Sequence, residues 1–132
     1  MKDLIIEATK SSPFINFTDA GETLSITGES YLENAAEFYA PVFDWLKGYL
    51  EDPLKKPLLL DVELIYFNSS SSKILMNLFD MLNRAGIEGT PVTINWRYHE
   101  DNDVALECGE EFMEDLDMVH LSFNLIAISD GA

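Results

Sequence analysis

The chain has 132 residues, which suits a single domain spanning residues 1–132 and is enough to bury one hydrophobic core. Its 24 acidic and 8 basic residues give a formal net charge of -16 at pH 7, which would repel phosphate backbones and anionic lipid surfaces, so we expect neither nucleic acid nor a membrane as partner. We also expect a cytoplasmic protein, because residues 1–30 lack the basic start and apolar core of a secretion signal, and no apolar run reaches the roughly 20 residues of a membrane span.

The first third of the chain predicts short strands followed by a helix. Residues 4–9, 14–18 and 23–27 are β-like runs, and Asp19-Ala20-Gly21 is a turn signal between the last two, so we expect a hairpin there. The pattern Asn34-Ala35-Ala36-Glu37 resembles a capping box and predicts a helix that continues to about residue 50. Pro41 lies inside this pattern, and it either kinks the helix or begins its main segment.

The middle of the chain predicts a long strand, a run of serines and an amphipathic helix. The strand covers residues 58–68, and its alternation predicts these side chains on the core face: Leu58, Leu60, Val62, Leu64 and Tyr66. Residues 69–72 are all serine. The helix after them should end at Gly86, a residue type common after a helix C-terminus, and should bury one stripe of side chains: Ile74, Leu75, Leu78, Leu82 and Ala85.

The last third predicts a strand, a helix and a final strand. Residues 92–99 and 119–129 alternate between apolar and polar side chains, and a helix from near Asp103 to about Leu116 separates them. Strands that keep one polar face argue against a sheet covered on both sides. We therefore expect a two-layer α/β sandwich, with a mixed sheet of five or six strands and three helices mainly on one face.

The serine run lies where a helix start leaves backbone amides without intrahelical acceptors. Serine is a leading N-cap residue, so one or two of residues 69–72 are expected to cap the helix. The same amides, with the positive end of the helix dipole, would accept a phosphate on one of these serines. The run is therefore both a capping segment and a candidate regulatory site.

Motifs for catalysis and cofactor binding are missing from the sequence. There is no Gly-x-Ser-x-Gly elbow and no glycine-rich phosphate loop, and His99 and His120 are expected to be isolated surface residues on polar strand faces. Asp101-Asn102-Asp103 resembles the start of a calcium loop, but Ala105 and Leu106 stand where such a loop needs an oxygen ligand and a glycine. We predict no catalytic residue, no cofactor and no metal, and hence no enzyme.

The predicted third helix is strongly acidic. Every charged residue between positions 100 and 117 is a carboxylate, and the helical period turns several of them outward: Glu107, Glu110, Glu111, Glu114 and Asp115. We interpret them as a solvated helix face, with a docking surface for a basic partner as the alternative. Cys108, the single cysteine, falls on the buried stripe of this helix and is expected in the core.

Several segments carry a resemblance to a known family: residues 8–13, 28–34, 43–46, 64–73 and 96–98. The most specific is the Tyr-x-Asn-Ser/Thr-Ser-Ser element after a strand, at residues 66–71. Together they make the chain similar to the SiaC family of biofilm-regulating bacterial phosphoproteins over nearly its whole length. That family resembles the STAS domains of anti-sigma-factor antagonists, in which a serine or threonine at a strand-to-helix junction accepts phosphate.

The resemblance implies which residues carry the function. By position, the phosphoacceptor threonine of the family falls on Ser69, and Ser70 and Ser71 remain alternatives. The expected partner-binding residues are Asn68, Ser69, Ser70, Ser71, Ser72 and Lys73. Asn68 is expected at the surface beside Ser69 and Tyr66 in the core, while Lys73 either pairs with the phosphate or covers the first turns of the helix.

The resemblance also implies a partner-switching circuit. A SiaB-like kinase would phosphorylate the protein and a SiaA-like phosphatase would restore it. The unphosphorylated form would bind and activate a SiaD-like diguanylate cyclase, and so control cyclic di-GMP and biofilm formation. The alternatives are a STAS-type anti-sigma-factor antagonist and, less favoured, a small enzyme that uses the open sheet face or the carboxylates near Glu100.

Overall fold

The structure is a computed structural model that describes residues 2–18, 24–116 and 120–129. It contains a sheet of six strands: β1 (Leu4–Ile6), β2 (Phe14–Phe17), β3 (Leu24–Ser30), β4 (Leu58–Phe67), β5 (Val92–His99) and β6 (Leu121–Ile128). Three helices connect the later strands: α1 (Ala35–Glu51), α2 (Ser69–Ile87) and α3 (Asp103–Asp115). The predicted turn at Asp19-Ala20-Gly21 and the predicted strand residue Val119 lie outside the described residues.

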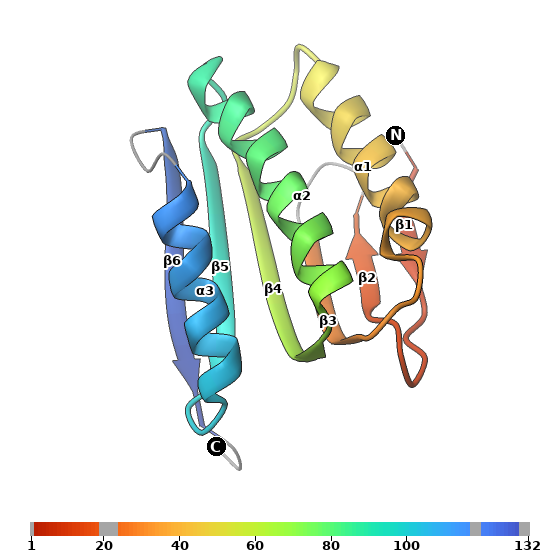
Figure 1. Ribbon diagram of the computed structural model, residues 1–132. Helices are drawn as coiled ribbons and strands as arrows, with labels where there is room; N and C mark the ends of the chain where they lie inside the picture. The colour runs from red at the N-terminus through yellow and green to blue at the C-terminus, as the bar shows by residue number, and fades with distance from the viewer. Residues whose placement is uncertain (1, 19–23, 117–119, 130–132) are drawn as a thin grey trace.

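The strands lie in the sheet in the order in which they occur in the chain. Strands β1, β2 and β3 pair antiparallel, whereas β3, β4, β5 and β6 pair parallel, and a helix bridges each parallel pair. Because such crossovers share one hand and the strand order advances in one direction, all three helices fall on the same face of the sheet. Figure 1 shows this arrangement. The expected two-layer α/β sandwich with a mixed sheet is confirmed.

The hydrophobic core fills the space between the sheet and the helices. Trp96, on β5, is 1% exposed, and its indole Nε1 donates a hydrogen bond of 2.9 Å to the carbonyl oxygen of Ala105 on α3. The Trp96 ring meets Phe79 and Phe112 edge-on. A Cβ on Gly109 would lie 2.7 Å from the Trp96 side chain, so glycine is what lets α3 approach the sheet this closely.

A bulge at the end of β4 overturns the predicted faces of that strand. The parallel register pairs Gly28 with Leu64 but Glu29 with Tyr66, so Ile65 is an extra residue that shifts the alternation by one. Tyr66 is consequently 65% exposed, not buried as predicted. Phe67 turns inward instead and packs edge-on against Trp96.

Helix α1 begins as predicted, whereas the end of α2 differs from the prediction. Asn34 caps α1 by accepting a hydrogen bond of 3.1 Å from the Glu37 amide, and Pro41 lies within this single helix. Helix α2 does not end at Gly86 but continues to Ile87, and the residue in the left-handed region is Gly89, with φ 109°. Gly86 is required for another reason: a Cβ there would collide with the carbonyl oxygen of His120.

Candidate functional site

The candidate regulatory site lies at the junction of β4 and α2, at the carboxyl edge of the parallel strands. Asn68 is the N-cap of α2: its side-chain oxygen accepts a hydrogen bond of 2.9 Å from the Ser71 amide, and its carbonyl oxygen accepts one of 3.0 Å from the Ser72 amide. The predicted serine cap is therefore wrong. Asparagine is an equally strong cap, and it frees the serines to occupy the first turn.

Asn68 is also fixed from outside the helix. Its side-chain Nδ2 donates a hydrogen bond of 2.9 Å to the carbonyl oxygen of Leu32, and its amide donates one of 3.2 Å to the carbonyl oxygen of Ser30. The side chain, expected at the surface, is half-buried and engaged through both of its polar atoms. Asn68 therefore holds the start of α2 against the segment that leads into α1.

The serines at residues 69–72 differ sharply in accessibility. Ser69 and Ser70 are exposed, and Ser72 is half-buried with its hydroxyl donating to the carbonyl oxygen of Ser69 at 3.0 Å. Ser71 has no exposed surface. The structure therefore corrects the expectation that Ser71 is a surface contact, and a kinase could reach its hydroxyl only if the first turn of α2 opened. Ser69 remains the predicted acceptor, with Ser70 as the accessible alternative.

Beneath the exposed serines runs a buried chain of hydroxyls. The Ser30 hydroxyl donates a hydrogen bond of 2.8 Å to Ser71 Oγ. Its oxygen lies 2.8 Å from Tyr39 Oη, which must act as the donor because the single Ser30 proton is already used. Burial raises the pKa of Tyr39 to about 12. The three hydroxyls join α1, β3 and α2 directly behind the candidate site.

The surroundings of Ser69 suit an added phosphate electrostatically. Ser69 is the first residue of α2, where amides lack intrahelical acceptors and the helix dipole is positive. The first turn of α2 contains no acidic residue. Lys73 is exposed and follows Ser69 by one helical turn, so the two side chains share one face of the helix. A phosphate on Ser69 would therefore be tolerated by the folded protein.

The remaining residues that the sequence suggested for function are Asn102 and the two histidines, and none of them belongs to the candidate site. Asn102 caps α3 by accepting from the Ala105 amide at 3.1 Å, and its Nδ2 donates to the carbonyl oxygen of Ile65 at 3.0 Å. The acidic stretch around Asn102 is thus explained as a helix start. His120 is exposed before β6, and His99 is half-buried at the end of β5. Among the described residues, no group of three or more His, Cys, Asp or Glu side chains could hold a metal ion.

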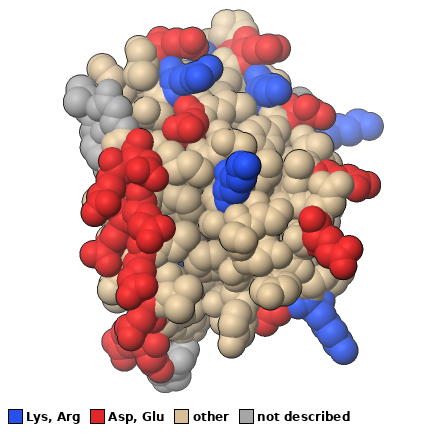
Figure 2. Space-filling view, viewed as in Figure 1, with Lys and Arg blue, Asp and Glu red and all other residues tan. Residues whose placement is uncertain are grey.

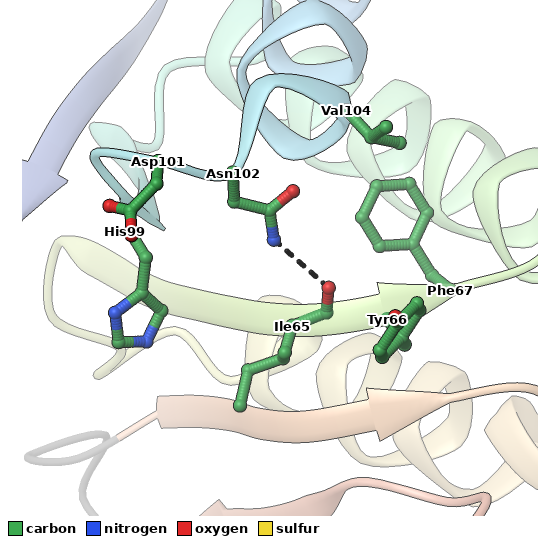
Figure 3. A pocket seen from close by; sticks show the side chains of 7 residues that line it. All are labelled: Ile65, Tyr66, Phe67, His99, Asp101, Asn102 and Val104. Atoms are coloured by element: carbon green, nitrogen blue, oxygen red, sulfur yellow. Dashed lines mark hydrogen bonds between the residues drawn. The ribbon is translucent and has the colours of Figure 1, made fainter. Parts of the chain in front are cut away.

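An open groove that the sequence does not predict lies next to the candidate site. The groove has a volume of about 550 Å³ and lies between the end of β4 and the turn that leads from β5 into α3. Figure 3 shows Ile65, Tyr66 and Phe67 on the β4 side, and Asn102 reaching across from the turn to the Ile65 carbonyl. Val104 forms its rim on α3. The bulge at Ile65 creates this groove by turning Tyr66 outward, and strict alternation could not have predicted it.

Comparison with known proteins agrees with this geometry. The model of the family described as SiaC family regulatory phosphoprotein matches residues 6–128. The chain belongs to the SiaC family. An uncharacterized protein of Pseudomonas aeruginosa (strain UCBPP-PA14) is 41% identical over 115 residues, which cover 87% of this chain and 90% of that protein.

Two solved structures extend the SiaC family relationship. The crystal structure of apo-SiaC from P. aeruginosa has a TM-score of 0.82 and 39% sequence identity, covering 96% of this chain and 100% of that one. The SiaC chain in the crystal structure of the diguanylate cyclase SiaD with its activator SiaC, also from P. aeruginosa, has a TM-score of 0.85 at 39% identity, with the same coverage. The family, and with it a regulatory role, is thus established. Within the described residues, none of the helices has the length and apolar character to cross a bilayer.

Proposed function

We propose that this protein is a phosphorylation-switched regulator that, with Ser69 unmodified, binds and activates a diguanylate cyclase. The observation that carries the proposal is the exposed hydroxyl of Ser69 at the N-terminus of α2, in a chain 39% identical to a SiaC solved as the activator of the cyclase SiaD. A SiaB-like kinase adds the phosphate and a SiaA-like phosphatase removes it. The protein itself performs no catalysis and acts in the cytoplasm by binding.

The physical basis of the switch is a difference between the free and the bound state. In the free protein a phosphate on Ser69 remains hydrated, and the helix dipole stabilises it by about 0.3–1 kcal/mol. In a close interface the same group, with a charge of about -1.5 to -2, loses its water, which costs several kcal/mol unless a cation replaces it. A penalty of about 3 kcal/mol would weaken binding by more than about a hundredfold. Phosphorylation therefore blocks the complex without unfolding the protein.

The decisive experiment compares forms of the protein that differ at position 69. Ser69→Ala should bind the cyclase as the unmodified protein does, whereas protein with phosphoserine incorporated at position 69 should bind at least about a hundredfold more weakly. Ser69→Asp carries a single charge and should give a smaller loss. Ser122→Asp, at an exposed serine on β6, is the matched control and should bind normally. Titration calorimetry measures each dissociation constant, and thermal melts should show little change among the variants.

The affinities and the mapped phosphosite both test the role of Ser69. Equal affinity of the phosphoserine form and the unmodified form would remove Ser69 from the mechanism. Phosphosite mapping of protein purified from its native host should find the modification on Ser69. A phosphate found only on Ser70 would move the acceptor by one residue, and a phosphate on Ser71 would require the first turn of α2 to open, because that hydroxyl is buried.

A further inference from the structure

The sheet ends on one side in a long strand that carries no charge. Strand β6 pairs only with β5, so the backbone N–H and C=O groups along its other side, here called the outer edge of β6, have no partner strand within the described residues (Figure 1). The eight residues of this strand include no charged residue, no proline and no glycine. An uncharged edge strand of this length readily pairs with a strand of another molecule.

The opposite edge of the sheet is protected in ways that β6 is not. Strand β1 has only three residues, and the exposed Asp3 and Glu7 flank it. Short edge strands and charged side chains are common means by which proteins prevent the sheets of two molecules from joining. The outer edge of β6 therefore needs protection from a neighbouring element if the chain is to remain a monomer.

Helix α3 is that neighbouring element. It packs against β5 and β6, and no lysine or arginine follows Arg97 in the sequence, so no such side chain on α3 or β6 offsets its negative charge. Figure 2 shows the carboxylates of α3 as a column of red side chains along the side of the molecule where β6 lies. The acidic face of α3 consists of these exposed residues: Asp103, Glu107, Glu110, Glu111, Glu114 and Asp115.

Pairing of two copies through β6 would bring two acidic faces together. Two antiparallel β6 strands related by a twofold axis perpendicular to the sheet would lie about 4.8 Å apart, with the helices of both copies on the same face of the joined sheet. Because α3 lies over β5 and β6, the two α3 helices would become neighbours, roughly 10 Å apart. This separation is close to the Debye length of about 8 Å at 0.15 M salt, so the carboxylates of the two copies would repel each other.

We propose that the outer edge of β6 is a self-association surface for a second copy of this chain, and that the acidic face of α3 keeps two copies apart at ordinary salt concentrations. The acidic face thus acts by repulsion. Once its charge is removed or screened, the two β6 strands pair and two sheets become one. This inference goes beyond the proposed function and does not depend on it, because it involves neither Ser69 nor the cyclase.

The first test removes charge from the acidic face. The neutralised variant carries three substitutions on α3: Glu107→Gln, Glu110→Gln and Glu114→Gln. The matched control removes the same charge from exposed positions on α1: Glu37→Gln, Asp44→Asn and Glu51→Gln. Because like charges brought together across an interface cost several kcal/mol, the neutralised variant should dimerise at least about a hundredfold more tightly than the control. Sedimentation velocity over a range of protein concentrations measures both, and thermal melts check that each variant is folded.

Salt should have the same effect as neutralisation. The unsubstituted protein should dimerise more strongly at about 1 M sodium chloride, where the Debye length is about 3 Å, than at about 0.05 M. The neutralised variant should depend on salt much less. Hydrogen–deuterium exchange then locates the contact, because pairing through β6 should slow the exchange of amides within residues 121–128.

The second test blocks the edge strand itself. Ser122→Asp, introduced into the neutralised variant, places a charge at an exposed position of β6 and should restore the monomer. Ala40→Asp is the matched control, because it adds the same charge at an exposed position of α1, a helix that packs beside β1 at the other end of the sheet. The neutralised variant with Ala40→Asp should still dimerise.

Several results would overturn this inference. The neutralised variant could remain a monomer, it could dimerise no more tightly than the α1 control, or its slowed amides could lie outside β6. The unsubstituted protein could also dimerise at low salt as tightly as the neutralised variant, which would show that the acidic face does not keep copies apart. None of these measurements uses the cyclase, so their failure leaves the proposed function standing. Equally, a failed Ser69 experiment would leave this inference intact.

Discussion

The Ser30 hydroxyl donates a hydrogen bond of 2.8 Å to the Ser71 hydroxyl, joining residues 41 positions apart in the chain. This bond connects the end of β3 to the first turn of α2, and the Tyr39 hydroxyl extends it to α1 at 2.8 Å. Both serines are fully buried. The exposed candidate acceptor Ser69 thus sits on a turn whose position is fixed from behind by polar contacts.

Removing the buried acceptor should destabilise the protein. Ser71→Ala leaves the Ser30 donor without its partner in a buried site, and we expect a loss of about 1–3 kcal/mol in the free energy of unfolding. Ser70→Ala is the matched control, because Ser70 is the exposed neighbour in the same turn and should change stability little. Urea denaturation of both variants measures the difference. Equal stabilities would mean that the hydroxyl chain contributes nothing to the fold.

Asn68 should contribute more to the free energy of unfolding than an ordinary N-cap residue does. Asn68→Ala removes the acceptor for the Ser71 amide and the donor to the Leu32 carbonyl, so we expect a loss at or above the upper end of the usual range for a cap, about 2 kcal/mol. Asn68→Asp keeps the acceptor and lacks the donor, and its stability should lie between those of Asn68→Ala and the unsubstituted protein. The same denaturation measurement tests this order, and a loss as large in Asn68→Asp as in Asn68→Ala would assign the effect to the contact with Leu32.

Replacing Gly86 with alanine should change stability in the direction opposite to the one that helix propensity predicts. Alanine normally stabilises a helix interior relative to glycine by about 0.5–1 kcal/mol, and we expect that gain for Gly48→Ala at an exposed position in α1. Gly86→Ala should instead destabilise the protein by about 1–3 kcal/mol, because the new Cβ meets the backbone carbonyl of His120. Thermal melts of the two variants should therefore shift in opposite directions. A rise in melting temperature for both variants would show that the His120 carbonyl can move away from the new Cβ.

Cys108 should react slowly with alkylating reagents at ordinary pH. Burial, and to a lesser extent the Glu111 carboxylate, raises the pKa of the Cys108 thiol from 9.0 to about 11. Only the thiolate reacts, so the alkylation rate of the folded protein should keep rising with pH until about 11, whereas in urea it should level off nearer 9. Glu111→Gln should move the folded-state midpoint slightly downward. Rapid alkylation of the folded protein at pH 8 would contradict the half-buried placement of this thiol.

Features that depend on near neighbours in the chain could be predicted from the amino-acid sequence. The alternation along residues 92–99 places Ile94 and Trp96 in the core, and Asn34 caps α1, because side-chain direction in a strand and amide satisfaction at a helix start are set within a few residues. The same local rules predicted that a strand ends at residue 68 and that a helix begins at or after the serines at residues 69–72. Local information was therefore enough for the class of fold and for the approximate location of the candidate site.

Which side chains of that site reach solvent depends on contacts between segments that are distant in the chain. The bulge at Ile65 depends on the pairing of β4 with Gly28 and Glu29, which are distant in the chain, and it turned Tyr66 outward and created the groove. Likewise, four successive serines are equivalent as a sequence, but Ser71 is buried and bonded to Ser30, which in turn contacts Tyr39, while Ser69 stays exposed. Burial is a property of what packs against a residue, and for both features the packing partners come from β3 and α1.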